Sequence, residues 1–399
     1  MQKYILFGIK VAAIALVIFV QTLETRATWG NFDTSFGFAG VAFDSVTGHH
    51  PQSVALQTDG KFLVTGYRTT LFAGKGFFLR RYLSDGQIDT SFGTNGGVIG
   101  PEANFRGSDY RGNAIVVQAN GKIAVAGWAN GYHAVWQFTS SGKADKTFGD
   151  GGLQVLSSYR VINNYYPEMN IQSGKLLLSV RKQIGSDRKI AVVRLNSNAT
   201  LDTHFGNAGE SLTGIYGGDK GSGTVVETDG KITIGGIKYN DLNAKGLERK
   251  LANGQDDLTF SPPTIFSFGA VFPGLVKMDN GKYAMRWGNL GANSSITLVL
   301  ETFNSAGVFE SSVSPYNGNS GAGCPEVFTK QNDGKLIVQF LGFLFRLNDE
   351  IEGGSIEMND CSNLGGMTHL ARASIQSDDK MVVAGVYNNY LMLARLLPN

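Results

Sequence analysis

A polar turn ending in Lys, placed between two apolar runs, recurs seven times and constrains the fold more than any other feature. Gly precedes the Lys in every copy but the last, which has Asp379. Val54–Gly66 reads VALQTDGKFLVTG and Ile115–Gly127 reads IVVQANGKIAVAG. The runs are too short for helices and rich in Val and Ile, and Asp-Gly or Asn-Gly between such runs indicates a β-hairpin. The lysines of the seven turns are Lys61, Lys122, Lys175, Lys231, Lys282, Lys335 and Lys380.

A second element follows most of these hairpins. It is a strand, a polar turn, an aspartate and then Phe-Gly, as in IDTSFG ending at Gly93 and LDTHFG ending at Gly206. It decays to DDLTF at Asp256–Phe260 and is hard to see in the last copies. We expect the Phe to pack between neighbouring repeats and the Gly to turn the chain into a fourth strand. Four strands per repeat are typical of a propeller blade.

The two ends of the repeat region complement each other. Trp29–Gly37 and the following strand are the end of a repeat, whereas Ala373–Gly385 and Leu391–Leu397 are the start of one. Pairing them would remove the open sheet edges. The sequence therefore predicts an all-β fold, a seven-bladed β-propeller of four-stranded antiparallel blades closed by an N-terminal strand that completes the last blade. Six or eight blades, or an open stack, are the alternatives.

The N-terminus has the pattern of an export signal. Lys3 and Lys10 supply positive charge, and Val11–Val20 is a ten-residue apolar run. That length suits a signal peptide and is short of the roughly 20 residues that span a bilayer. We expect residues 1–27 to be a signal peptide and residues 28–399 one propeller domain, in an exported protein that is periplasmic, secreted or on the cell surface. An uncleaved anchor or a buried helix is the alternative.

Charge and cysteine content narrow the function classes. Lys+Arg 35 against Asp+Glu 33 gives a net charge of +2, which argues against a nucleic-acid-binding protein. The two cysteines, Cys324 and Cys361, have no partner at metal-ligand spacing, so no metal site is predicted. In an exported protein they are candidates for one disulfide. No motif indicates a cofactor, and we expect none.

The repeat resembles the bacterial delta-60 repeat family. The family pattern is LDTSFG, then VALQPDGKILVAG and FALARYNPDG, and Gln87–Gly97, Val54–Gly66 and Phe78–Gly86 are similar to it. The resemblance covers residues 30–399 and fades after residue 250. It implies an exported propeller of unassigned function, often in surface or secreted proteins. It brings no catalytic residue to this chain.

Propellers usually bind ligands at the axial mouth, where loops enter the innermost strands. The residue eleven before each turn lysine should lie there, which with its neighbours gives the candidates His49, His50, Arg111, Tyr165, Tyr166, Glu168, Lys220, Phe272, Glu326 and His369. The histidines, with Glu326, could converge as a metal site or general base, or could simply face solvent. The Tyr-Tyr pair with Arg111 and Phe272 could form an aromatic and cationic mouth, or ordinary loop packing.

Three functions are compatible with these patterns. The first is a non-catalytic binding module that recognises a glycan, peptide or surface protein through its mouth loops, as a monomer and without nucleic acid. It would touch a membrane only through an uncleaved signal. The second is a lyase, lactonase or hydrolase that uses the histidine cluster, and the third is a structural or adhesive surface repeat. The absence of a catalytic motif favours the first.

Overall fold

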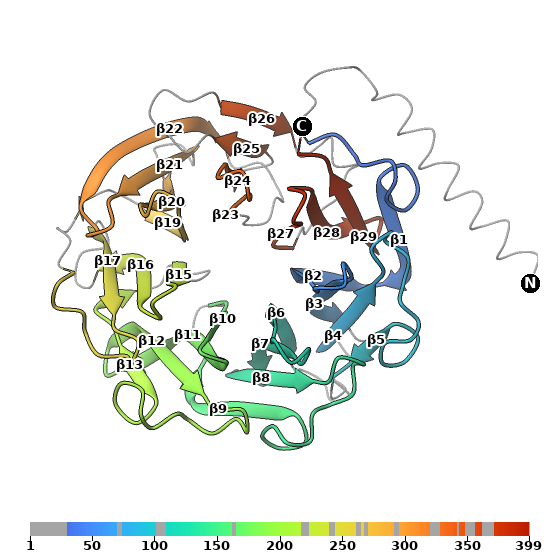
Figure 1. Cartoon of the computed structure of the whole chain (residues 1–399), viewed down its shortest axis with the longest axis horizontal. Coiled ribbons are helices and arrows are strands. Elements are labelled where there is room, and N and C mark those ends of the chain that lie inside the picture. Colours follow the sequence, from blue (N-terminus) through green and yellow to red (C-terminus); the bar gives the residue numbers. More distant parts are fainter. Residues whose placement is uncertain are drawn as a thin grey trace, which may run out of the picture.

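The computed structural model describes residues 30–69, 74–100, 109–161, 165–216, 223–238, 244–260, 265–266, 270–290, 295–319, 328–340, 343–347, 356–360 and 371–398. Every regular element in these ranges is a β-strand, and the strands form seven separate sheets. These ranges contain no helix able to cross a membrane. The sheets are arranged radially around a central axis (Figure 1). The prediction of a seven-bladed β-propeller is confirmed.

Each blade begins next to the axis and runs outward through antiparallel neighbours. Blade 1 contains β2 (His49–Leu56), β3 (Phe62–Thr69), β4 (Lys75–Tyr82) and β5 (Gly97–Ile99). Blade 2 contains β6 (Tyr110–Val117), β7 (Ile123–Ala129), β8 (Tyr132–Phe138) and β9 (Leu153–Arg160). Blade 3 contains β10 (Glu168–Gln172), β11 (Lys175–Ile184), β12 (Asp187–Leu195) and β13 (Glu210–Leu212).

Blade 4 contains β14 (Ile215–Tyr216), β15 (Gly223–Val226), β16 (Ile232–Lys238), β17 (Ala244–Lys250) and β18 (Ile265–Phe266). It departs from the four-strand pattern because two short strands, β14 and β15, both pair with β16. Blade 5 contains β19 (Ala270–Lys277), β20 (Tyr283–Leu290), β21 (Ser295–Phe303) and β22 (Phe309–Asn319). Blade 6 contains β23 (Phe328–Lys330), β24 (Leu336–Phe340), β25 (Phe343–Leu347) and β26 (Ile356–Asp360).

Blade 7 is built from both ends of the chain. Its strands from the axis outward are β27 (Ser374–Ile375), β28 (Met381–Tyr387), β29 (Tyr390–Leu396) and β1 (Val41–Thr47). Val41 pairs with Ala394 and Phe43 with Met392 in antiparallel register. The N-terminal strand therefore completes the last blade, as the complementary ends of the sequence predicted.

The turn lysines lie where the first strand of a blade meets the second. In blade 1 the Gln57 amide donates to the Lys61 carbonyl at 2.8 Å, and the Gly60 amide donates to the Gln57 carbonyl at 3.0 Å. Gly60 has φ 81°, in the left-handed region that costs glycine little. The Asp59 carboxylate accepts from the Lys61 amide at 3.2 Å. These bonds explain the recurring Asp-Gly-Lys letters.

The hydrophobic core lies between the blades, and the Phe of each Phe-Gly pair contributes to it. Phe92 is fully buried in the core between blades 1 and 2. A Cβ on Gly142, in a turn of blade 2, would come within 2.9 Å of the Phe92 ring, so this turn needs glycine. The amide of Gly93 also donates to the Ser141 carbonyl at 2.9 Å. The predicted packing of the Phe between repeats is confirmed, and the fully or mostly buried set is Phe36, Phe92, Phe148, Phe205 and Phe260.

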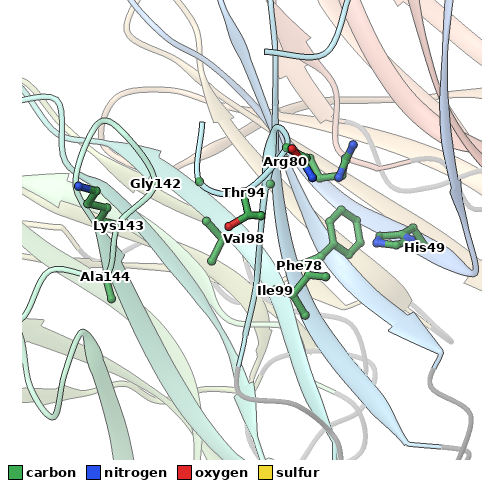
Figure 2. A pocket seen from close by; sticks show the side chains of 12 residues that line it. His49, Phe78, Arg80, Thr94, Val98, Ile99, Gly142, Lys143 and Ala144 are labelled. Carbon is green, nitrogen blue, oxygen red and sulfur yellow. The ribbon is translucent and has the colours of Figure 1, made fainter. Parts of the chain in front are cut away.

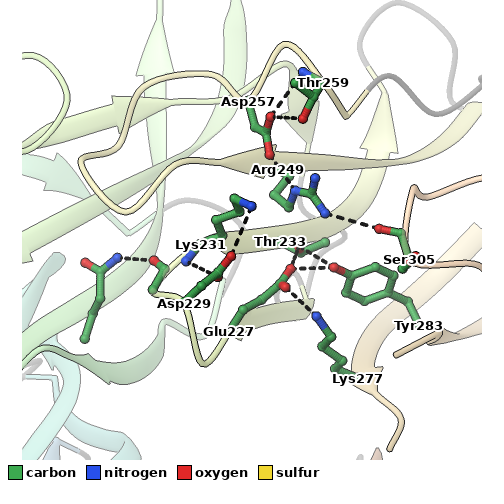
Figure 3. A network of polar contacts seen from close by, with 12 residues as sticks. Glu227, Asp229, Lys231, Thr233, Arg249, Asp257, Thr259, Lys277, Tyr283 and Ser305 are labelled. Atoms are coloured by element: carbon green, nitrogen blue, oxygen red, sulfur yellow. Dashed lines mark hydrogen bonds and ion pairs between the residues drawn. The ribbon is translucent and has the colours of Figure 1, made fainter. Parts of the chain in front are cut away.

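An arginine near the end of the third strand joins the turn to the next blade in blades 1, 3, 4 and 7. In blade 4, Arg249 Nε donates to Asp257 Oδ2 at 2.8 Å, and its Nη1 donates to the Ser305 carbonyl of blade 5 at 3.2 Å (Figure 3). The same guanidinium lies 4.3 Å from the centroid of the Phe260 ring. Arg81, Arg194 and Arg395 repeat the arrangement in blades 1, 3 and 7. We call these contacts the arginine latches and their end of the propeller the latch end.

Candidate functional site

The mouth candidates belong to the end of the propeller opposite the latches, where β2, β6 and β10 begin next to the axis (Figure 1). Seven of the ten residues proposed from the sequence have a described backbone, and Phe272 among them lies in β19. Lys220, Glu326 and His369 lie outside the described residues, as do Cys324 and Cys361. The disulfide and those three candidates therefore stay predictions.

The described mouth residues of blades 1 to 3 form a continuous stack of planar groups. The His50 ring stacks on Tyr67 with centroids 4.7 Å apart and an interplanar angle of 16°. The Arg111 guanidinium lies 5.3 Å from the Tyr67 centroid and 4.1 Å from that of Trp128. Trp128 in turn stacks on Tyr166 at 5.5 Å and 14°. We call this set of five the mouth stack.

The charge at the centre of the mouth stack is balanced. Asp109 accepts from Arg111 Nε and Nη2, each at 2.6 Å, in a bidentate ion pair. Arg111 is only 8% exposed, and the bidentate pair with the more exposed Asp109 fixes the position of the guanidinium between the two rings. The stack is therefore rigid, because each member is fixed by the groups on either side.

Lys75 adds a positive charge beside the stack. Its Nζ lies 4.9 Å from the centroid of the Tyr67 ring, and it forms no ion pair within the described part of the chain. Burial, followed by the neighbouring Arg111 charge, lowers the pKa of Lys75. The ammonium is thus partly dehydrated and lacks a carboxylate of its own, which suits it to an anionic ligand group.

Tyr165 and Tyr166 have different environments although they are adjacent. Tyr165 is fully buried, its carbonyl accepts from Trp128 Nε1 at 3.0 Å, and its ring meets His133 edge-on. Tyr166 is half-buried. Tyr166 is consequently accessible to a ligand, whereas Tyr165 supports the interface of blades 2 and 3.

His49 and His50 do not converge, because adjacent residues of a strand point to opposite faces. His49 is 7% exposed, contacts Phe78 edge-on at 4.6 Å, and its Nδ1 lies 2.9 Å from the Thr47 carbonyl oxygen. Burial lowers the pKa of His49. His50 instead belongs to the mouth stack. Within the described residues no three His, Cys, Asp or Glu side chains gather at metal-binding distance.

Glu168 takes part in a contact between blades that are not neighbours. Arg372 Nη2 of blade 7 donates to Glu168 Oε1 of blade 3 at 3.5 Å. Blades 1 and 2 lie between these two blades in the ring. The pair therefore crosses the axial channel and narrows it.

Three members of the site were absent from the sequence candidates, namely Tyr67, Lys75 and Trp128. Tyr67 is the cross-strand partner of His50, and Trp128 is that of Arg111. Tyr67 lies six residues after the turn lysine Lys61, and Trp128 lies six residues after Lys122. Counting six residues forward from each turn lysine, as well as eleven backward, would have located Tyr67 and Trp128. Lys75 follows the undescribed segment 70–73 and gave no such signal.

Two segments of the chain match a family model, described as a domain of unknown function (DUF5122) beta-propeller. The matches are residues 57–92 and 118–148, which include the turn lysines of blades 1 and 2 and end at Phe92 and Phe148. This chain is a repeat β-propeller. No curated protein matches its sequence.

Solved structures with the same fold have very different sequences. A protein of unknown function from Dyadobacter fermentans is 12% identical with a TM-score of 0.45, and the match covers 90% of this chain and 100% of that one. Extracellular domains 1-2 of Drosophila Semaphorin 1a are 9% identical, with a TM-score of 0.50 over 89% and 87%. A puromycin-hydrolyzing peptidase from Mycobacterium tuberculosis is 11% identical, with a TM-score of 0.49 over 91% and 52%. At 9% identity the similarity to the Semaphorin domains shows the fold alone.

Proposed function

We propose that this propeller is an exported binding module whose mouth recognises a glycan that carries an acidic group. The mouth stack, with the unpaired Lys75 ammonium beside it, is the observation that supports this proposal. Half-buried Tyr67 and Tyr166 supply partly accessible rings for the apolar faces of sugars. Lys75 supplies the charge for a uronate, sulfate or phosphate group.

The side chains of the mouth stack are already held in place, so a glycan would bind without rearranging them. Arg111 is held by Asp109 and by the two rings around it, so little side-chain entropy is lost when a ligand binds. Sugar hydroxyls need hydrogen-bonding groups, and the site offers tyrosine hydroxyls and the exposed Asn130 amide, whose Nδ2 donates to Tyr110 Oη at 2.7 Å. Binding needs no metal in this proposal.

The test is a thermal-shift titration of the protein with acidic and neutral oligosaccharides, for example trigalacturonate and its uncharged counterpart, with and without chelator. A ligand of the folded state raises Tm through RT ln(1 + [L]/Kd). We expect a rise with the acidic sugar that persists with chelator and falls in Lys75→Met. Lys146→Met, at an exposed lysine of the latch end, is the matched control.

Two results would overturn the proposal. One is an equal shift for the acidic and neutral sugars in both lysine variants. The other is the absence of any shift across a panel of acidic glycans, in which case capture of a protein partner becomes the next experiment. A rise that requires a divalent metal and is lost in His50→Ala would instead support an enzyme at the mouth.

A further inference from the structure

A groove of ≈ 750 Å³ lies at the outer strands β4 and β5 of blade 1, and His49 at the start of β2 forms part of its wall. Its walls include His49, Phe78, Arg80, Val98, Ile99 and Lys143. Figure 2 shows His49, Phe78 and Ile99 gathered on one side, with Lys143 on the turn of blade 2 across from them. The volume lies within the roughly 300–1,000 Å³ typical of small-molecule sites.

The charges in this groove are positive. Among the described residues that line it, Arg80 and Lys143 are cations and none is a carboxylate. Arg80 Nε and Nη2 lie 2.5 and 3.1 Å from the Asp44 carboxylate, which is buried. Lys143 is exposed and forms no ion pair within the described chain. Asp44 is therefore the one carboxylate described near the groove, and among the described residues it forms an ion pair with Arg80 alone, so the charge of Lys143 is not balanced by an ion pair.

Arg68 increases this excess of positive charge. It is the cross-strand partner of His49 and lies on the same face of blade 1. Its Nε is buried without a hydrogen-bond partner, and it forms no ion pair within the described residues. An unpaired guanidinium beside the groove favours an anion there, because a carboxylate or similar group would supply the missing acceptor.

Blade 2 lacks the pair of residues that lines the groove in blade 1. Ile99 pairs with Phe78 on the edge strand, and the corresponding pair in blade 2 is Val155 with Ala134. Arg80 lies two residues after Phe78 in blade 1. The equivalent position in blade 2, two residues after Ala134, is the buried Trp136. Blade 2 therefore has no equivalent of the Phe78 ring beside the Arg80 cation, so the repeat pattern by itself does not require this combination.

The geometry points to a second binding site, and we propose that the groove binds a small amphipathic carboxylate. Its apolar body would lie against Phe78 and Ile99, which share one face of the blade and of which Ile99 is 53% exposed. Its carboxylate would lie on the Arg80 side, and Lys143, which lines the groove from the turn of blade 2, would add a second positive charge. Burial lowers the pKa of His49, so this ring is a neutral part of the wall at pH 7.

The experiment is isothermal titration calorimetry of the whole protein with octanoate, using octanamide as the uncharged probe of similar shape. We expect octanoate to bind about tenfold more tightly, since hydrogen bonds to ionised groups are the stronger ones. Lys143→Glu should weaken octanoate binding about fivefold. Ile99→Gln should also weaken it about fivefold through lost apolar contact.

Matched controls come from the repeat itself. Val155→Gln changes the equivalent edge position of blade 2, and Lys146→Glu reverses an exposed charge three residues from Lys143. Both should retain octanoate binding, as should the mouth variant Lys75→Met. The absence of saturable octanoate binding, equal affinity for octanamide, or equal loss in Val155→Gln would each overturn the proposal. Circular dichroism melts of all variants exclude unfolding as the cause.

Discussion

At the residue scale, His133 is a buried polar group without a hydrogen-bond partner among the described residues. Its side chain is fully buried, and neither ring nitrogen has a hydrogen-bond partner in the described structure. Burial, reinforced by the Arg181 charge, lowers the pKa of His133 to about 3. The imidazole is therefore neutral in the folded protein, and no hydrogen bond within the described part of the chain offsets the free-energy cost of removing it from water.

We predict that His133→Leu stabilises the protein, and more so in acid. The unfolded chain takes up a proton near pH 6.5, while folded His133 does so only near pH 3. Stability due to this residue is therefore lost as pH falls from about 6.5 toward 3. The gain should be about 1 kcal/mol at pH 7.5 and about 3 kcal/mol at pH 5. Urea unfolding at both pH values checks this, and a pH-independent difference would contradict it.

At the element scale, the turn that follows the third strand also connects the blades. In blade 3, Arg194 Nε donates to Asp202 Oδ2 at 2.7 Å, and Nη1 donates to the Ala252 carbonyl of blade 4 at 2.9 Å. Blade 2 has Gln137 at this position, which reaches Asp145 at 2.7 Å within its own blade. Blade 2 thus has glutamine in place of the latch arginine but retains the aspartate, Asp145, as its partner.

We predict that Arg194→Met destabilises the propeller by about 3 kcal/mol, because it leaves buried Asp202 with Lys175 as its remaining cation. Arg194→Gln, which copies blade 2, should cost about 1 kcal/mol. Chemical unfolding of the three proteins measures the difference. Equal losses in the two variants would mean that the guanidinium contributes only through its packing on Phe205.

A second prediction at this scale concerns Gly142. A Cβ at this position would come within 2.9 Å of the Phe92 ring and of the Gly93 nitrogen, and its φ is 84°. Gly142→Ala should therefore destabilise the protein by about 2 kcal/mol through strain and displacement of Phe92. Gly121→Ala is the control, since its φ of 78° is similar but the nearest atom lies 3.6 Å away. The difference in Tm isolates the inter-blade contact.

At the scale of the whole molecule, the ring is closed by groups far apart in the chain. Arg395 Nε donates to Asp33 Oδ2 at 2.8 Å, and Phe36 is fully buried in the core between blades 7 and 1. Tyr82 of blade 1 also donates to Asp44 of β1 at 2.7 Å. Closure thus uses the same arginine latch as blades 1, 3 and 4, with an added buried hydrogen bond.

Removing the closing strand should show its energetic role. We predict that a chain beginning at Thr28 is as stable as the whole chain, whereas one beginning at Gly48 loses at least about 5 kcal/mol and associates through the exposed edge of β29. Light scattering and chemical unfolding test this. A stable monomer beginning at Gly48 would mean that six blades and an incomplete seventh suffice.

The latch aspartates also predict how the ring responds to acid. Burial alone would raise the pKa of Asp202, but hydrogen bonds from Lys175 and Arg194 outweigh it and lower the pKa to about 2. Asp33 likewise has a pKa of about 2. Each contributes stability that is present above about pH 4 and lost as pH falls through 2, about 2 kcal/mol apiece. Unfolding titrations should show this slope reduced in Asp202→Asn; an unchanged slope would contradict it.

The sequence by itself determined the number of blades, the hairpin turns and the packing of each Phe-Gly pair, because these depend on local turn chemistry and a countable period. It also placed His50, Arg111 and Tyr166 near one another. Only the tertiary structure decided that Tyr67 and Trp128 join them, that His49 faces the outer groove, and that Tyr165 is buried. Those outcomes depend on strand parity and on contacts between blades, where residues distant in sequence meet and no local pattern records the partner.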